Sequence, residues 1–398
     1  MNYGFSKLSI RDLELEGKHL FTRVDFNVPL QGGSVVDDTR IKAALPTLEM
    51  AVEKKARIVL TSHLGRPGGK RREEFSLRPV AHHLSSLMKQ EITFVGDCIG
   101  PEVEESVKTL QPGRLLLLEN LRFHEGETKN DPEFSRKLGA WVEEYVNDAF
   151  GAAHRAHAST AGLPQILGKG AAGLLMEKEL EYLSRVLFHP QHPVVAILGG
   201  AKVSDKMEVI ENLLSFADVI LIGGGMAFTF LKAQNKNIGK SIVEKDKLEF
   251  ARDLMESAAS HGVVLRFPVD SVIAQKREPG VQSRVAEADG IPEDWIGLDI
   301  GPRTVEEFRK EIWQAQTIIW NGPLGVFEID GFADGTLAIA RAVAESDALS
   351  VVGGGDSVSA VIKAGVQNEI THISTGGGAS LEFLAGKTLP GVEILTDR

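Results

Sequence analysis

The residues best suited to chemistry follow short apolar runs, and in the first half of the chain they are arginines and histidines. They occur in TRVDFNVP (22–29), SHLGRP (62–67), NLRFH (120–124) and AHRAH (153–157). Guanidinium groups match carboxylates and phosphates through paired hydrogen bonds, and several converging arginines carry too much positive charge for a neutral ligand. The first half therefore predicts a site for a small polyanion.

In the second half, glycines occupy the equivalent places. They occur in LGGAK (198–202), IGGGM (222–226), NGPLG (321–325), VGGGD (352–356) and STGGG (374–378). Glycine-rich turns between a strand and a helix let backbone N–H groups approach a phosphate chain, and the helix dipole favours the anion. This half predicts a nucleotide site. A reaction that joins a nucleotide to a small polyanion is phosphoryl transfer, in which catalysis is mostly positioning and charge neutralisation.

Two lysines in GGAKVSDK (199–206) add cations to the nucleotide half. Lys202 and Lys206 lie four residues apart, which predicts a helix that begins just after Gly200 and carries both ammonium groups on one face. There they would follow the charge of a transferring phosphoryl group. Asp356, at the end of VGGGD, is predicted to hold Mg²⁺, which prefers carboxylates together with substrate phosphates.

Taken singly, each of these residues has a simpler interpretation. Arginines and lysines are commonly solvated surface charges, and His63 fits a core or loop position. Asp356 and Ser357 stand where a helix N-cap is expected. The separation of arginine loops from glycine loops along the whole chain is harder to explain in this way, and it favours the functional interpretation.

The elements that must position these loops alternate between strand and helix. Several predicted strands are continuous apolar runs, as in strands buried on both faces, and helical periodicity separates most of them. The predicted strands are 19–26, 57–61, 115–118, 194–198, 219–222, 263–267, 317–320, 349–352 and 372–374; helices are expected over 207–216 and 245–260, among others. This alternation predicts α/β domains with parallel sheets, whose ligands bind beyond the carboxyl ends of the strands.

Length, charge and cysteine content narrow the class of protein. A chain of 398 residues favours two domains, with a boundary expected near residues 170–192. A net charge of −11 argues against nucleic-acid or membrane-surface partners, and a membrane span is not expected. Cys98 is the single cysteine, and no secretory signal is recognisable, so the cytoplasm is expected by elimination. The phosphate-binding P-loop, the protein-kinase motif set and a clear dinucleotide fingerprint are all missing.

Motifs along nearly the whole chain, in order, resemble phosphoglycerate kinase. The most specific are RVDFNVP (23–29) and STGGGASLEFLAGK (374–387). The others are DTRI (38–41), TSHLGRP (61–67), ENLRFHEGE (119–127), NDAFGAAHRAHAS (147–159), GGAKVSDK (199–206), IGGGMAFTF (222–230), LDIGP (298–302), WNGPLGVFE (320–328) and GGGDS (353–357). The resemblance implies reversible phosphoryl transfer from 1,3-bisphosphoglycerate to MgADP, which gives 3-phosphoglycerate and MgATP.

The resemblance also implies roles for residues at matching positions. The residues expected to hold the phosphoglycerate are Asp25, Asn27, Arg40, His63, Arg66, Arg122 and Arg155. Those expected to hold the nucleotide are Lys206, Gly297, Leu298, Glu328, Gly354, Gly355, Asp356 and Ser357. Gly297 and Leu298 would contact the adenine, Glu328 the ribose, and Asp356 the metal. The expected catalytic residues are Arg40, Lys202 and Lys206.

For the architecture, the resemblance implies two similar-sized Rossmann-like domains with a hinge and an interdomain cleft. The expected divisions are a phosphoglycerate-binding domain (1–175), a connecting helix or hinge (176–192) and a nucleotide-binding domain (193–388), with a tail (389–398) that packs back on the first domain. A monomer is expected. Because the acceptor carboxylate is already ionised at neutral pH, no general base is required, but the two anionic substrates must be brought together by domain closure.

Two alternatives remain open from the sequence. A nicotinamide-dependent dehydrogenase would also have two α/β domains and glycine-rich turns, but it would need a dinucleotide fingerprint and a ribose-binding acid. A phosphometabolite sensor without catalysis would keep the binding arginines but have no need of Lys206 or Asp356. Both residues are present, which favours an enzyme.

Overall fold

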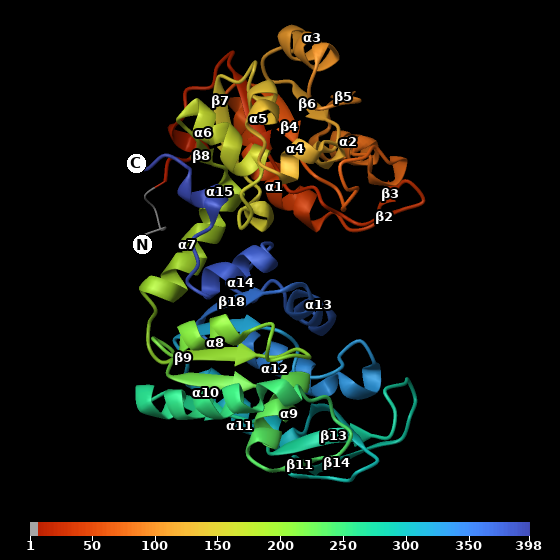
Figure 1. The fold of residues 1–398 in the computed structure, drawn as a ribbon, viewed down its shortest axis with the longest axis vertical. Helices are drawn as coiled ribbons and strands as arrows, with labels where there is room; N and C mark the ends of the chain where they lie inside the picture. The colour runs from red at the N-terminus through yellow and green to blue at the C-terminus, as the bar shows by residue number, and fades with distance from the viewer. Residues whose placement is uncertain (1–6) are drawn as a thin grey trace. The chain divides into compact units, whose positions relative to one another are not determined.

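The chain folds into two α/β units, each built on its own parallel sheet (Figure 1). The computed structural model describes residues 7–398. One unit runs to Glu181 and takes in Thr388–Arg398, and the other spans Tyr182–Lys387. The predicted fold class of two parallel-sheet α/β domains flanked by helices is confirmed.

The sheet of the N-terminal unit has six parallel strands in the order β5-β6-β4-β1-β7-β8. Their bounds are β1 (His19–Arg23), β4 (Arg57–Thr61), β5 (Ile92–Val95), β6 (Leu115–Leu118), β7 (Glu144–Asn147) and β8 (Ala171–Ala172). The central strands are buried along nearly their whole length because helices cover both faces. β5, β7 and β8 were not predicted from the sequence, since they are short and two of them include polar residues.

Helices connect these strands and enclose the apolar core of the unit. They are α1 (Thr39–Glu53), α2 (Arg78–Met88), α3 (Pro101–Thr109), α4 (Glu125–Thr128), α5 (Pro132–Leu138), α6 (Leu163–Leu167) and the first half of α7 (Leu174–Phe188). A short hairpin of β2 (Leu30–Gln31) and β3 (Ser34–Val35) precedes α1. Side chains from α1, α2 and the central strands form one continuous cluster that holds the sheet and helices together.

The C-terminal tail packs against this N-terminal unit. The backbone N–H of Thr396 donates to Gly170 O at 2.9 Å, and the Asn147 side-chain amide donates to Gly391 O at 3.0 Å. The tail includes α15 (Pro390–Glu393), which lies against this unit in Figure 1. The last residues of the chain therefore help to hold the loop that follows β7.

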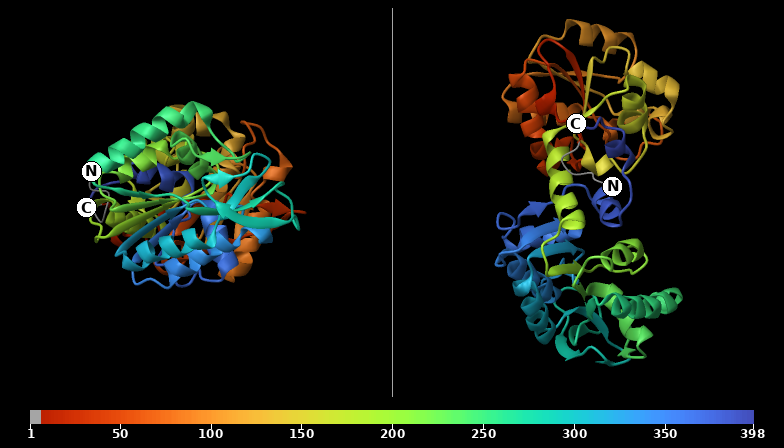
Figure 2. Two further views of the ribbon diagram at one scale, coloured as in Figure 1. Left: turned by 90° about the horizontal axis from the view of Figure 1, so that it is seen from below. Right: turned by 90° about the vertical axis from the view of Figure 1, so that its left-hand side faces the viewer.

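The sheet of the second unit also has six parallel strands, in the order β12-β10-β9-β17-β18-β19. Their bounds are β9 (Val194–Leu198), β10 (Val219–Ile222), β12 (Val264–Arg266), β17 (Thr317–Asn321), β18 (Leu349–Gly353) and β19 (His372–Ile373). The helices are α8 (Met207–Leu213), α9 (Gly224–Ala233), α10 (Leu248–His261), α11 (Pro302–Gln314), α12 (Asp334–Ala344), α13 (Gly355–Ala364) and α14 (Gly378–Leu384). They lie on both faces of the sheet: in the left view of Figure 2 the green α10 lies on one side and the blue α12 on the other. α14 packs beside α8, where the Asn212 side-chain amide donates to Leu384 O at 2.7 Å.

The strand order of this sheet reverses direction between β9 and β17. From β9 the chain proceeds outward through β10 to β12, and it then returns to β17 on the other side of β9. Loops that leave neighbouring strands at such a point turn to opposite faces of the sheet, and the crevice between them is where open α/β sheets bind ligands. The glycine-rich loops after β9 and β17 lie at this point.

A separate three-stranded antiparallel sheet in this unit was not predicted. It contains β13 (Asp270–Ala274), β14 (Ser283–Glu287) and β16 (Ile296–Ile300), in the order β14-β13-β16. A two-stranded pair, β11 (Asn237–Ile238) and β15 (Gly290–Ile291), lies in the same part of the chain. β14 is exposed, whereas β13 and β16 are largely buried but include polar and glycine residues that interrupt their apolar runs.

Candidate active site

The arginine-bearing loops of the N-terminal unit come together because β1, β4, β6 and β7 are parallel and end at the same edge of the sheet. After β1, the Asp25 carboxylate pairs with Arg40 Nη1 at 2.7 Å, at the start of α1. The Asn27 side-chain oxygen accepts from Gly65 N at 2.9 Å in the loop after β4. Arg122, after β6, donates to Gly65 O at 2.8 Å. Hydrogen bonds between the loops thus set the geometry of these predicted site residues.

A buried network lies behind these loops and was missed in the sequence. The fully buried Arg23 donates through Nε to Ser159 Oγ at 2.8 Å and lies 3.2 Å from His63 Nδ1 through Nη2. Ser159 Oγ donates in turn to the buried Glu127 carboxylate at 2.6 Å. Both Arg23 and Ser159 stand inside motifs quoted above, but nothing in their spacing predicts that they meet.

The electrostatics of this region favour an anion. Burial and the neighbouring Arg23 guanidinium hold the pKa of His63 well below its ordinary value, so the imidazole is neutral at pH 7. Burial, together with Arg23 and Arg155, lowers the pKa of Arg122 to about 10. Burial and Arg122 lower the pKa of His157 to about 3. These shifts show that positive charge is crowded here, and a bound polyanion would relieve that crowding.

Arg66 and Arg155 are less tightly held than the other predicted binding residues. Arg66 is exposed in the loop after β4. Arg155 is half-buried in the segment after β7, and its Nε lies 3.0 Å from His154 Nε2. Within residues 7–398, both guanidinium groups keep N–H donors that no protein group accepts from.

A cavity of about 260 Å³ in the second unit collects predicted nucleotide-binding residues from distant parts of the sequence. Gly297, Leu298, Glu328 and Asp356 all line it. Its walls are mostly apolar, and the lining residues absent from the sequence prediction include Phe228, Ile242, Pro323 and Leu324. An apolar slot with a few polar groups at its ends suits a planar base that continues into a charged chain.

Gly297 is required by the shape of this cavity. A Cβ at this position would lie 2.1 Å from Phe228 Cζ, far inside van der Waals contact. Gly297 is held in place in β16, where its N–H donates to Ser241 Oγ at 2.9 Å. Glu328 lies at the exposed side of the cavity and forms an ion pair with Arg277 at 3.6 Å.

The prediction that Lys202 and Lys206 share one helix face is wrong. α8 begins only at Met207, with Lys206 as its N-cap residue. The preceding backbone is bound by neighbouring segments instead, because Gly200 N donates to Pro323 O at 2.8 Å and Gly200 O accepts from Met226 N at 3.0 Å. Gly200 has φ +104°, outside the helical region.

The two lysines consequently have different surroundings. Lys202 is exposed, whereas Lys206 is buried and donates to the Asn321 side-chain oxygen at the end of β17. Burial lowers the pKa of Lys206 to about 8, although Asp205 and Asp356 raise it. A buried ammonium group with a neutral hydrogen-bond partner would be stabilised further by an added anion. Asn321 was not among the predicted site residues, although it stands in the NGPLG motif.

The loop after β18 leads into α13. Gly354 has φ +90°, and Asp356 is exposed in the first turn of the helix. Neither Asp356 nor Ser357 caps α13, so the capping interpretation does not explain them. Ser357 Oγ instead accepts from Gly322 N at 2.6 Å, and Ser357 is fully buried.

Comparison with known proteins identifies the family of this chain. The family model described as phosphoglycerate kinase matches residues 10–387. The chain belongs to the phosphoglycerate kinase family. Members of this family are phosphotransferases, so the dehydrogenase alternative is excluded.

Close relatives match along the whole length. Phosphoglycerate kinase of Acidobacterium capsulatum is 56% identical over 403 residues, covering 99% of this chain and 100% of the relative. That of Moorella thermoacetica is 54% identical over 393 residues, with the same coverage. The solved structure of phosphoglycerate kinase from Coxiella burnetii superposes with a TM-score of 0.90 at 43% identity, over 98% of both chains. That from Pyrococcus horikoshii has a TM-score of 0.84 at 35% identity, also over 98% of both chains.

Within residues 7–398, no helix combines the length and the apolar character that crossing a bilayer demands.

Proposed function

We propose that this phosphoglycerate kinase family member transfers a phosphoryl group reversibly between 1,3-bisphosphoglycerate with MgADP and 3-phosphoglycerate with MgATP. The observation that carries the proposal is the pairing of two unlike sites in one chain. One unit holds a cluster of arginines around a neutral histidine, and the other holds an apolar cavity that ends in glycine turns, a buried lysine and an exposed carboxylate.

The phosphoglycerate is bound, in this proposal, by the loops after β1, β4, β6 and β7. Its residues are Asp25, Asn27, Arg40, His63, Arg66, Arg122 and Arg155. Asp25 holds Arg40 through the 2.7 Å ion pair, and the neutral His63 can offer a hydrogen bond without adding charge. Arg66 and Arg155 supply the donors that protein groups leave open.

The nucleotide is bound at the cavity of the second unit. Its residues are Lys206, Gly297, Leu298, Glu328, Gly354, Gly355, Asp356 and Ser357. The apolar wall beside Gly297 and Leu298 takes the adenine, and Glu328 lies where a ribose hydroxyl would reach it. The phosphates then extend toward Lys206 and the first turn of α13, where backbone N–H groups point outward.

The site fits Mg²⁺ bound together with nucleotide. Asp356 is exposed at the cavity, and within residues 7–398 no cation lies within ion-pair distance of its carboxylate. One carboxylate plus substrate phosphates is a common arrangement for Mg²⁺, which neutralises phosphate charge when it is bound.

The proposed reaction needs no general base. A carboxylate oxygen of 3-phosphoglycerate attacks the γ-phosphorus of ATP, the bond to the bridging oxygen breaks, and ADP leaves with that electron pair. The carboxylate is ionised at neutral pH, so no proton has to be removed. Catalysis then consists of holding the two anions in line while cations from both sides balance the charge on the transferring group. Arg40, Lys202 and Lys206 are the residues proposed to do this.

Transfer requires the two substrates to meet, so we propose that the units close on each other during turnover. The divisions proposed are a phosphoglycerate-binding domain over 1–175, a connector over 176–192 and a nucleotide-binding domain over 193–388, with the tail 389–398 on the first domain. Closure would also exclude water that hydrolyses the acyl phosphate. Small-angle scattering with both substrates should show a smaller radius of gyration than without them, and an unchanged profile would contradict closure.

The deciding experiment measures ATP consumption with 3-phosphoglycerate and Mg²⁺, the acyl phosphate being trapped by a coupled NADH-oxidising dehydrogenase. The wild type should turn over, Lys206→Ala should not, and Lys232→Ala, which changes an exposed lysine on α9, should keep wild-type activity. No turnover by folded protein that still binds 3-phosphoglycerate would favour the sensor alternative.

We further propose that the protein acts as a monomer in the cytoplasm. Small-molecule substrates require neither a nucleic acid nor a membrane partner. The single cysteine, Cys98, is buried and unpaired, in keeping with a reducing compartment.

A further inference from the structure

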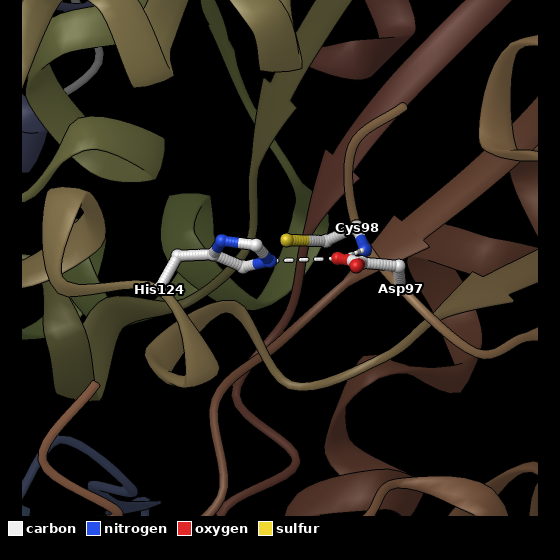
Figure 3. Close-up of side chains that lie close together, drawn as sticks. All are labelled: Asp97, Cys98 and His124. Carbon is white, nitrogen blue, oxygen red and sulfur yellow. Dashed lines mark hydrogen bonds and ion pairs between the residues drawn. The ribbon is translucent and has the colours of Figure 1, made fainter. Parts of the chain in front are cut away.

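Three side chains of metal-binding type meet outside the proposed active site (Figure 3). Asp97 and Cys98 follow β5, and His124 follows the 3₁₀ turn Leu121–Phe123. One donor atom from each lies within 4.8 Å of the other two. This is the only such group in the part of the chain that the structure describes. In Figure 3 the Cys98 sulfur lies beside the imidazole ring, and the Asp97 carboxylate faces Nε2.

Without a metal, the cluster is held together by hydrogen bonds to one carboxylate oxygen. His124 Nε2 lies 2.7 Å from Asp97 Oδ1, and Cys98 N donates to the same oxygen at 2.6 Å. The Cys98 side chain is buried, and burial keeps the pKa of its thiol well above the ordinary value. A protonated, buried thiol is a poor target for oxidants, so a redox-sensing role does not fit.

We propose that Asp97, Cys98 and His124 form a site for a borderline divalent cation such as Zn²⁺. Sulfur, imidazole nitrogen and carboxylate oxygen together are the ligand set that Zn²⁺ takes in proteins, whereas Mg²⁺ takes oxygen. The site is therefore distinct in chemistry from the Mg²⁺ site proposed at Asp356.

The geometry needs only small side-chain rotations to accept the ion. Ligands around a tetrahedral zinc lie roughly 3.3–3.8 Å apart, given bonds of about 2.0–2.3 Å. The donor atoms here are already within 4.8 Å of one another. The side chains of Asp97 and His124 are 46% and 31% exposed, so both can turn, and solvent can supply the fourth ligand.

The surroundings admit a cation. An open cavity of about 380 Å³ adjoins His124. Its charged lining residues are Glu125, Asp131, Glu133, Lys129 and Lys137, a formal excess of one negative charge. Glu125 pairs with Lys129, and Glu133 pairs with Lys137 at 2.8 Å, so both ammonium groups are already engaged by carboxylates.

Binding has a defined proton balance. The Cys98 S–H bond breaks, a sulfur–metal bond forms, and one proton passes to solvent for each ion bound. His124 gives up its hydrogen bond to Asp97 and binds the ion as a neutral imidazole through Nε2. Metal affinity should consequently rise with pH, because the thiol must lose its proton.

Cobalt(II) gives the sharpest test, because a thiolate-to-cobalt charge-transfer band can arise only from Cys98, the single cysteine of the chain. Metal-free wild type should develop this band on titration with Co²⁺, reach its maximum at one ion per chain and lose it on adding Zn²⁺. Millimolar Mg²⁺ should not displace the cobalt. His124→Gln and Asp97→Asn should each weaken cobalt binding by more than about tenfold, judged from the same band.

His82→Gln, which changes an exposed histidine on α2, is the matched control and should bind cobalt like the wild type. Thermal melting of each variant establishes that it is folded. Absence of the band in folded wild type would overturn the proposal, and so would a cobalt affinity in folded His124→Gln equal to that of the wild type.

Discussion

Lys206 should destabilise the ligand-free protein, and replacing it with methionine tests this directly. The ammonium group is buried at the N-terminus of α8, and its polar contact is Asn321. Burial holds its pKa at about 8 rather than 10.5. Methionine fills a similar volume without the charge. The variant should lose phosphoryl transfer while the free energy of unfolding at neutral pH rises or stays unchanged.

The magnitude follows from the pKa of Lys206. The gap between 10.5 and about 8 corresponds to about 3 kcal/mol against the folded protein at pH 7, at about 1.4 kcal/mol for each pH unit. Methionine removes this penalty but leaves the Asn321 oxygen unpaired, which costs about 2 kcal/mol. Lys206→Met should therefore be more stable than the wild type by about 1 kcal/mol at pH 7.

The sign of the pH dependence is the stronger test. The folded-state pKa of Lys206 is below its unfolded value, so between pH 8 and 10.5 the folded chain binds fewer protons than the unfolded chain. The free energy of unfolding of the wild type therefore rises with pH through this window, and the cost of burying Lys206 falls to about 1 kcal/mol at pH 10. Lys206→Met should then be less stable than the wild type by about 1 kcal/mol.

Urea unfolding at pH 7 and pH 10 measures this change of sign in the stability difference between Lys206→Met and the wild type. Every other titrating group is present in both proteins, so its contribution largely cancels. Lys202→Met is the matched control, because Lys202 is exposed, and its stability difference should stay within about 0.5 kcal/mol at both pH values. A stability difference for Lys206→Met that does not change with pH would refute the reasoning.

Three further predictions concern the other parts of the site. Glu127→Gln removes the buried charge opposite the arginine cluster and should cost about 3 kcal/mol of unfolding free energy, measured in urea; a cost below 1 kcal/mol would show that Glu127 is not its counter-charge. Gly297→Ala places a methyl group against Phe228 and should raise the KM for nucleotide at least tenfold in steady-state kinetics, while the KM for 3-phosphoglycerate stays unchanged. Arg40→Ala should lower kcat much more than it raises KM, because its charge is needed most in the transition state; a normal kcat with a raised KM would assign it to ground-state binding instead.

The sequence by itself determined the buried strands β1, β4 and β6 of the first sheet, the strands of the second sheet, and the character of the loops that follow them. Strands 194–198 and 115–118 are buried on both faces, and a strand of this kind appears in the sequence as an unbroken run of apolar residues. Parallel strands end at one edge of a sheet, so the arginine loops had to share one edge and the glycine loops another. Site residues could be predicted from the sequence where their position depends only on following a parallel strand at that edge.

Tertiary structure decided which groups meet and how they titrate. α8 begins only at Met207, and the backbone before it is held by hydrogen bonds between Gly200 and the distant residues Pro323 and Met226, which no local pattern reports. Ser159 reaches Arg23 across 136 positions, and Asn321 reaches Lys206 across 115. In the antiparallel sheet that carries Gly297, β13 and β16 are buried but contain polar and glycine residues, and β14 is exposed, so none of them is an unbroken apolar run. The pKa of each group depends on its burial and on the charges and hydrogen-bond partners around it. These surroundings, like the walls of the cavity, are formed by residues far apart in the sequence, so residue spacing does not predict them.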